Sequence, residues 1–225
     1  MHIPDGFIDI PTSAGFAAVS ATGVAIALKG AKSSLDEKTA PLAGLTATFI
    51  FAVQMLNFPV AAGTSGHLLG GALAAVLVGP YAASLALTVV LLMQGLLFAD
   101  GGLTALGLNI FNMSIIGVWV GYFIFIAAKR VLPKKKSSIA IAALIGGFIS
   151  VPAAALGFVL EYAIGGTATF SVSTVASAMV GTHILIGIGE GLITFFAVSA
   201  VMASRADLVY GYKDVANSLE IRSAS

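Results

Sequence analysis

Cysteine is absent from this 225-residue sequence, and charged residues make up only 9% of it. Without cysteine the chain can form no disulfide bond and can offer a metal ion no thiolate ligand. So little charge cannot cover the surface of a soluble globular protein of this length. Hydrophobic residues make up 58% of the chain, and the mean hydropathy is +1.03. The composition therefore indicates an integral membrane protein.

Several enzyme motifs are also absent. The sequence contains no glycine-rich phosphate loop of the G-x-x-x-x-G-K type, the usual cradle for the phosphates of ATP. If ATP drives this protein, another chain must hydrolyse it. Neither a His-Glu-x-x-His motif nor a triad-like arrangement suggests hydrolysis. We therefore expect that the protein is not an enzyme, and we expect no nucleic-acid partner.

Long apolar runs predict an all-α membrane protein, a bundle of about seven transmembrane helices. A spanning helix needs about 20 mostly apolar residues, whereas the strands of a membrane barrel show alternating segments of about 10 residues. The apolar runs here are continuous. The expected spans are residues 12–28, 40–56, 68–78, 82–99, 103–128, 138–160 and 174–203.

Basic residues of short loops favour the cytoplasmic side of a membrane. With the N-terminus outside, the segments expected inside carry all 11 Lys and Arg residues. We therefore expect a single transmembrane substrate-binding domain over residues 1–225, with an extracellular segment at 1–11 and a cytoplasmic tail at 205–225. A signal peptide fits poorly, because the first basic residues follow the first apolar run. The acids expected outside form a mildly negative rim or ordinary surface polarity, namely Asp5, Asp9, Asp100 and Glu161.

The N-terminal dipeptide Met1-His2 offers three nitrogen atoms in series: the α-amine, the amide of His2 after deprotonation, and the imidazole of His2. These atoms can close a five-membered and a six-membered chelate ring around one metal ion. If a ring nitrogen of His67 fills the remaining place, the site is an all-nitrogen plane, which suits Ni(II) or Cu(II) and disfavours zinc. Because His2 is bulky, we expect Met1 and its amine to be retained.

Ordinary roles are the alternatives for both histidines. A histidine at position 2 is often solvated, and His67, within GTSGHLLGG, could simply cap the start of the span at 68–78. The glycines of this run would also let the backbone turn sharply and would leave room for another segment to approach. We favour the metal-ligand role because the N-terminus and His67 complement each other.

Six further polar residues could support such a site. They are Ser65, Asn57, Asn109, Asn112, His183 and Glu190. The asparagines could fix the histidine rings through their second nitrogens, although helix–helix hydrogen bonds are their more ordinary role. The last two residues lie seven positions apart on one helical face, so they could form a gating pair near the metal or a mutually satisfied structural pair.

Together these residues resemble the NikM/CbiM family, the substrate-binding membrane (S) components of nickel and cobalt energy-coupling-factor (ECF) transporters. The resemblance covers essentially the whole chain and rests on MHIPDGF, NFPVAAGTSGHLLGG, GLNIFNMS and GTHILIGIGEGLIT. It implies seven spans and an N-terminal segment folded back into the extracellular end of the bundle. It also implies four metal ligands: the amine of Met1, the amide and ring nitrogens of His2, and the ring of His67.

The resemblance also implies partners and a substrate. The partners are a transmembrane coupling protein, a pair of cytoplasmic ABC-type ATPases and often a small accessory membrane protein. The opening Met-His-Ile-Pro-Asp-Gly looks more like nickel members than cobalt members, which typically read Met-His-Ile-Met-Glu-Gly. We therefore expect high-affinity Ni(II) uptake across a bacterial or archaeal cell membrane, with Co(II), for cobalamin synthesis, as the alternative. A membrane enzyme with a histidine-bound metal and a metal channel are two other classes to test.

Overall fold

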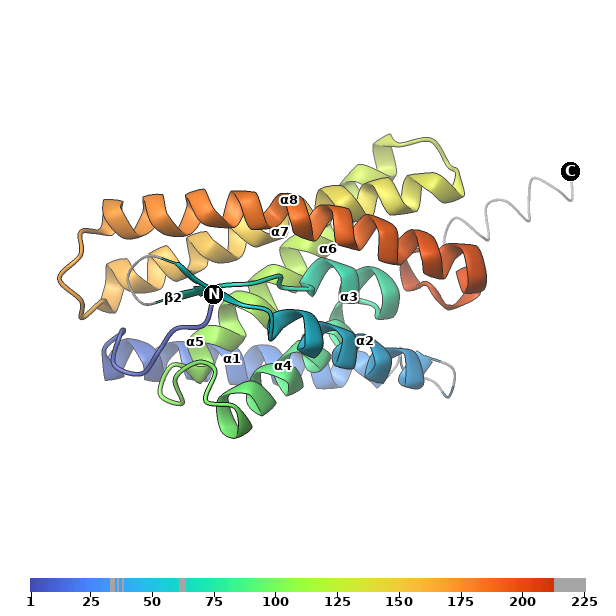
Figure 1. Cartoon of the computed structure of the whole chain (residues 1–225). Coiled ribbons are helices and arrows are strands. Elements are labelled where there is room, and N and C mark those ends of the chain that lie inside the picture. Colours follow the sequence, from blue (N-terminus) through green and yellow to red (C-terminus); the bar gives the residue numbers. More distant parts are fainter. Residues whose placement is uncertain (33–34, 36, 38, 61–63, 213–225) are drawn as a thin grey trace, which may run out of the picture.

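The computed structural model describes residues 1–32, 35, 37, 39–60 and 64–212. Most of this part of the chain is helical, and the long helices run along one common direction (Figure 1). The longer helices are α1 (Ile10–Ala31), α2 (Thr39–Gln54), α4 (Pro80–Leu97), α6 (Val118–Val131), α7 (Lys136–Gly165) and α8 (Val172–Arg205). The shorter elements are α3 (Gly71–Val78), α5 (Leu106–Asn109), the π-helix η2 (Ile110–Gly117) and the 3-10 turns η3 (Ala206–Leu208) and η4 (Tyr210–Tyr212).

Five helical runs are long and apolar enough to cross a membrane. They are Ile10–Ala31, Pro80–Leu97, Leu106–Val131, Lys136–Gly165 and Val172–Leu208. These runs match five of the seven predicted spans, with ends displaced by two to five residues. The other two predicted spans correspond to α2, with 16 residues, and α3, with 8 residues. Both are shorter than the roughly 20 residues that a simple spanning helix needs.

The helix α3 lies in the interior of the bundle, and all of its residues are buried. It begins at Gly71 and not at the predicted Leu68, because Gly70 adopts a φ of 77° that ends the extended chain before it. The backbone of α3 also approaches η2 closely. A Cβ atom at Gly71 would lie 2.9 Å from the carbonyl carbon of Gly117. The glycines of this run therefore allow close packing, as their density suggested.

A small antiparallel hairpin precedes α3, and the sequence analysis did not anticipate it. Its strands are β1 (Phe58–Val60) and β2 (Thr64–Gly66), with Phe58 opposite Gly66. Figure 1 shows β2 beside the N-terminus of the chain. The hairpin therefore brings the residues just before His67 next to Met1.

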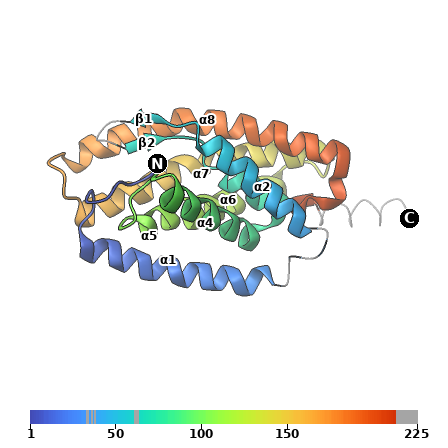
Figure 2. The same ribbon diagram turned by 60° about the horizontal axis from the view of Figure 1, so that its bottom comes forward.

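The helix α1 lies along the outside of the bundle (Figure 2). It begins at Ile10, where the Oδ1 atom of Asp9 accepts a hydrogen bond from the N–H of Thr12 at 2.8 Å and so caps the helix. The extended N-terminal segment therefore comprises residues 1–9, two fewer than predicted.

The helix α7 extends five residues beyond the predicted end and carries Glu161 inside the protein. This side chain is 0% exposed, and its Oε2 atom accepts a hydrogen bond from Nδ2 of Asn112 at 2.6 Å. The prediction that Glu161 belongs to an outer acidic rim was therefore wrong. An apolar helix that continues past position 160 buries this carboxyl and needs a polar partner for it.

The first part of the predicted cytoplasmic tail is folded. After α8, the turns η3 and η4 pack against the bundle, and Val209 and Tyr212 are buried. The Nζ atom of Lys129 donates a hydrogen bond to the carbonyl oxygen of Gly211 at 3.1 Å. Residues 206–212 of the predicted tail are thus folded against the bundle, whereas 213–225 lie outside the described residues.

Candidate metal centre

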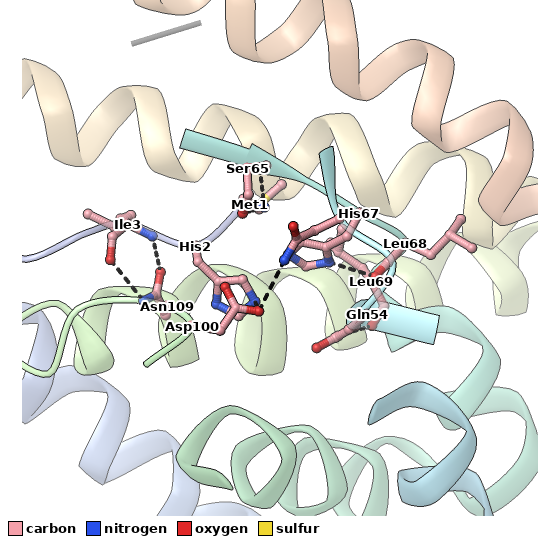
Figure 3. Close-up of polar contacts among 11 residues, drawn as sticks. Met1, His2, Ile3, Gln54, Ser65, His67, Leu68, Leu69, Asp100 and Asn109 are labelled. Carbon is pink, nitrogen blue, oxygen red and sulfur yellow. Dashed lines mark hydrogen bonds and ion pairs between the residues drawn. The ribbon is translucent and has the colours of Figure 1, made fainter. Parts of the chain in front are cut away.

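The N-terminal segment begins among the helices, where Met1 lies beside Ser65 and His2 lies near His67 (Figure 3). Met1 and Ile3 are 0% exposed, and His2 is 5% exposed. Asn109 of α5 holds Ile3 on both sides, because its Oδ1 accepts the Ile3 N–H at 2.8 Å and its Nδ2 donates to the Ile3 carbonyl at 3.3 Å. The N–H of Gly102 donates to the same carbonyl at 2.8 Å. These bonds fix the backbone immediately after His2.

The outer half of the segment is tied to two loops. The Oδ1 atom of Asp5 accepts hydrogen bonds from the N–H and the hydroxyl of Thr104 at 2.7 Å and 2.6 Å. The N–H of Thr167 donates to the carbonyl of Phe7 at 3.1 Å. A Cβ atom at Gly102 would collide with the backbone of Pro4 and Asp5. The segment is therefore docked along its whole length, and glycine at position 102 makes the close approach possible.

The α-amine of Met1 lies against Ser65. It donates to the carbonyl oxygen of Ser65 and, at 3.4 Å, to its hydroxyl. Burial lowers the pKa of this amine from 8.0 to about 4, although the charge of Asp100 acts in the opposite direction. At neutral pH the amine is therefore uncharged. The amine donates its hydrogens to Ser65, so its lone pair can bind a metal ion.

The backbone N–H of His2 makes no hydrogen bond to any residue that the structure describes, whereas the N–H of Ile3 is bonded. A metal ion could replace this hydrogen without breaking an existing bond. The ring of His2 is neutral at pH 7, because burial chiefly lowers its pKa from 6.5 to about 3. Its Nε2 atom lies 3.6 Å from Oδ2 of Asp100.

The ring of His67 stacks on the ring of His2, with centroids 4.7 Å apart and planes inclined at 29°. Its Nδ1 donates to the carbonyl of Leu68 at 2.8 Å. Since a carbonyl only accepts, the ring proton sits on Nδ1 and the lone pair on Nε2. This Nε2 is buried and has no hydrogen-bond partner within the described ranges. Burial, followed by the charges of Met1 and His2, lowers the pKa of His67 well below 6.5.

Glu190 of α8 holds the backbone that follows His67. Its Oε2 accepts the N–H of Leu69 at 2.9 Å, and its Oε1 accepts the N–H of Gly70 at 2.7 Å. The Nε2 atom of Gln54 donates to the carbonyl of Leu69 at 2.6 Å. His67 does not cap α3, since Gly70 is the N-cap residue. The two-pronged contact of Glu190 therefore fixes the loop that presents His67.

His183 and Glu190, which could have paired with each other, have different hydrogen-bond partners in the structure. The Nδ1 atom of His183 donates to the carbonyl of Met179 at 2.7 Å, one turn back on the same helix, and both oxygens of Glu190 bond the backbone after His67. The two side chains lie seven residues apart, too far along α8 to meet when each has a nearer partner.

Of the two roles considered for the three asparagines, the structure does not show hydrogen bonds to the histidine rings in the part of the chain that it describes. Asn109 bonds the backbone of Ile3, and Asn112 bonds Glu161. The Nδ2 atom of Asn57 donates to Oδ2 of Asp100 at 3.3 Å. Backbone carbonyls and carboxylates lie nearer to these amides than the rings do. Ser65 and Asn109 nevertheless hold the N-terminal segment, one at the amine of Met1 and the other at the backbone after His2.

The turn after α4 is also part of the centre, which the sequence did not predict. Asp100 was placed only in an acidic rim, but it lies beside His2, and burial chiefly raises the pKa of its carboxyl. Hydrogen bonds to Thr104 and Thr12 lower the pKa values of Asp5 and Asp9, respectively. The rim acids are thus engaged in specific contacts. The run Asp-Gly-Gly at the end of an apolar helix was the one sequence feature that could have indicated this turn.

No group of three or more His, Asp or Glu side chains that could hold a metal ion is found among the described residues. The arrangement instead brings together two histidine rings, a neutral amine and an unbonded amide. These are nitrogen donors, and the geometry that they favour is planar.

Comparison with known proteins agrees with this arrangement. The family described as “Cobalt uptake substrate-specific transmembrane region”, CbiM, matches residues 2–208. A protein of Archaeoglobus fulgidus whose name describes a fused nickel transport protein, NikMN, is 40% identical over 93% of this chain and 68% of its own length. The cobalt transport protein CbiM of Sorangium cellulosum is 35% identical over 93% of this chain and 94% of its own.

A crystal structure of a truncated transition metal transporter has the same fold. It superposes with a TM-score of 0.82 at 33% sequence identity, over 90% of this chain and 99% of the other. The family consists of metal transport proteins and not of enzymes, and the helices that could cross a membrane make this a multi-pass membrane protein of bacteria or archaea. The sequence match and the shared fold together show that the chain belongs to the NikM/CbiM family of metal transport proteins.

Proposed function

We propose that this chain is the high-affinity, metal-binding membrane subunit of a nickel uptake transporter. One observation carries the proposal. The N-terminus is buried, and its amine and the unbonded amide of His2 lie beside two stacked histidine rings. The four ligands are the amine of Met1, the amide nitrogen and ring Nδ1 of His2, and the ring Nε2 of His67.

Nickel is the preferred substrate in this proposal. Four nitrogen donors in one plane suit the square-planar preference of Ni(II), and nitrogen ligands bind Ni(II) more tightly than Co(II) in the general order of divalent metals. Names of relatives in this family divide between nickel and cobalt transport. Co(II) is therefore the alternative substrate, and a direct competition between the two ions decides between them.

The proposed membrane arrangement has seven crossings, with the N-terminus outside and the C-terminus in the cytoplasm. Five are the long helices, α2 is the sixth, and residues 68–70 together with α3 make the seventh. Non-helical backbone at membrane depth is tolerated where protein covers it, and Leu69 and α3 are buried. Residues 1–225 then form one domain whose segment 1–9 is the extracellular metal-binding part.

Transport against a gradient needs an energy source outside this chain, since the sequence has no ATP-binding loop. We propose ECF-type partners: a transmembrane coupling protein, a pair of cytoplasmic ABC-type ATPases and an accessory membrane protein. Reconstitution in vesicles tests this part. Nickel uptake that requires the ATPases and ATP supports it, whereas flux through the isolated chain would indicate a channel.

The experiment that tests the site is the metal content and absorption spectrum of the purified protein after incubation with Ni(II). One nickel per chain with the spectrum of a planar Ni(II)–nitrogen complex is expected. An octahedral Ni(II) spectrum, or equal binding of Zn(II), would contradict the proposed ligand plane.

A further inference from the structure

We propose that Asp100 is a positioning residue that keeps the proton of the His2 ring on Nε2, so that Nδ1 is presented to the metal ion. The inference rests on the proposed function and adds to it the residue that orients one of the ligands. Two steps lead to it, one from the chemistry of the chelate and one from the turn that carries Asp100.

The chelate can use only one nitrogen of the His2 ring. A metal ion bound to the amide nitrogen of His2 closes a six-membered ring through Nδ1, whereas Nε2 lies on the far side of the imidazole. Nε2 must therefore carry the ring proton when the metal is bound. A buried N–H needs an acceptor, and an outer acceptor commonly sets the tautomer and orientation of a metal-bound histidine.

Asp100 is placed to be this acceptor. Its Oδ2 lies 3.6 Å from Nε2 of His2, and Nε2 has no hydrogen-bond partner among the residues described. The distance is longer than that of a hydrogen bond. A cation on Nδ1 strengthens Nε2–H as a donor, and a small closure of the turn completes the contact. Asn57 fixes the same oxygen from the other side at 3.3 Å.

The backbone on both sides of Asp100 has unusual conformations, which hold its side chain next to His2. In the part of the chain that the structure describes, Ala99 is the one non-glycine residue with positive φ, at 51°, and Gly101 follows at 91°. The N–H of Asp100 donates to the carbonyl of Gln94 at 3.0 Å. A Cβ atom at Gly101 would lie 3.1 Å from Nδ1 of His2, so the turn lies directly against the ring. Strain of this kind persists where the surroundings enforce it, typically at functional sites.

The test uses the full-length protein with three substitutions. Asp100→Leu has a similar shape and no acceptor, and Asp100→Asn keeps one acceptor oxygen without the charge. Asp207→Asn is the control, because it removes an aspartate charge from η3, where Asp207 pairs with Arg205, and this turn belongs to no part of the proposed site. Each protein is titrated with Ni(II), and the tautomer of His2 is read from the ring ¹⁵N shifts of the metal-free protein.

We expect Asp100→Leu to weaken nickel binding by about 10- to 100-fold, the usual cost of losing an outer partner of a metal-bound histidine. Asp100→Asn should weaken binding less, and Asp207→Asn should leave it unchanged. The metal-free wild type should carry the His2 proton on Nε2, and Asp100→Leu should lose this preference. Unchanged nickel binding by Asp100→Leu, or a proton on Nδ1 of His2 in the wild type, overturns the inference.

The two proposals fail in different ways. If the wild type binds neither Ni(II) nor Co(II) stoichiometrically, the proposed function fails, and the ring ¹⁵N shifts still decide whether Asp100 sets the tautomer. If Asp100→Leu does not fold, the wild-type tautomer alone decides the inference.

Discussion

The Nε2 atom of His67 is a buried nitrogen with a free lone pair, and the ring that carries it stacks on the ring of His2 at a centroid distance of 4.7 Å. Two rings that bind one metal ion at adjacent corners of a plane have to lie close together, and this distance between the rings meets that requirement. His2 and His67 lie 65 positions apart in the sequence, so only the fold brings them together. The fold therefore places the two proposed ring ligands next to each other.

Replacement of His67 by alanine should abolish stable nickel binding, because it removes one of the four ligands. The protein should still fold, because Glu190 and Gln54 continue to hold the loop that carries position 67. Tyr212→Ala is the control, since it removes a buried ring from η4, which carries none of the proposed ligands. Nickel content after gel filtration is the measurement. Tight, stoichiometric nickel in His67→Ala would remove His67 from the ligand set.

Nickel binding near pH 7 should release about one proton per metal ion, which comes from the amide of His2. The amine of Met1 and the rings of His2 and His67 are already neutral, because burial lowers their pKa values to about 4, to about 3 and well below 6.5, respectively. Calorimetric titrations in buffers of different ionisation enthalpy give this number. No proton release would show that the amide is not a ligand.

The same shifts make docking of the N-terminal segment depend on pH. A basic group whose pKa falls from 8.0 in the unfolded chain to about 4 in the folded one contributes stability that is complete above pH 8 and is lost as pH falls towards 4. We therefore expect hydrogen exchange at the amide of Ile3 to accelerate progressively below pH 6, after correction for intrinsic rates. Constant protection down to pH 4 would contradict the burial of an uncharged amine.

The helices were largely predictable from sequence because apolar length alone defines a membrane span. The ends moved by a few residues, since caps such as Asp9 and glycines such as Gly70 decide them locally. The hairpin and the short α3 could not be predicted in detail. Their course depends on close contacts with distant segments, such as that of Gly71 with Gly117.

The core of the candidate site was predictable because chelation by Met1 and His2 depends on covalent spacing. The contacts that hold the site in place could not be predicted from the sequence. Glu190 reaches the backbone after His67 across 121 positions, and Asp100 reaches His2 across 98. Polar side chains in apolar helices need partners, but the sequence does not say which. Asn112, for example, donates a hydrogen bond to Glu161 and not to a histidine ring.

Glu190→Gln should weaken nickel binding and lower stability by about 1–3 kcal/mol, because one of two buried backbone donors then faces an amide nitrogen. These donors are the N–H groups of Leu69 and Gly70, which position His67. Glu161→Gln is the control, since it changes another buried carboxyl that bonds Asn112. Thermal unfolding and nickel titration of both variants check this. Equal loss of nickel binding in both would mean that the effect is general destabilisation.

Gly102→Ala should impair docking of the N-terminal segment, because the added methyl group would collide with the backbone of Pro4 and Asp5. A steric cost of about 1–3 kcal/mol corresponds to a roughly 5- to 150-fold loss of affinity. Gly95→Ala in α4 is the control, since its new Cβ would meet its nearest neighbours at an ordinary 3.8 Å. Nickel titration compares the two. Wild-type affinity in Gly102→Ala would argue against a docked segment in the metal-bound protein.

The sharpest prediction concerns the N-terminus itself. Insertion of one alanine between Met1 and His2 should severely lower nickel uptake. The amine of Met1 is buried against Ser65, and Asn109 and Gly102 hold Ile3 in place, so the docked segment has no room for an extra residue. A retained N-terminal tag should have the same effect, because acylation turns the basic amine into an amide.

Some nickel should still bind to the protein with the inserted alanine. With histidine at position 3, the new terminus can chelate through its amine, two amides and the ring, which fills the plane without His67. Such a site is complete before it reaches the bundle, and uptake fails because the metal no longer joins the N-terminal segment to the loop at His67. Uptake is compared in cells at matched expression, with a tag after Ser225 as the control. Normal uptake by the protein with the inserted alanine would show that the Met1 amine is not a ligand during transport.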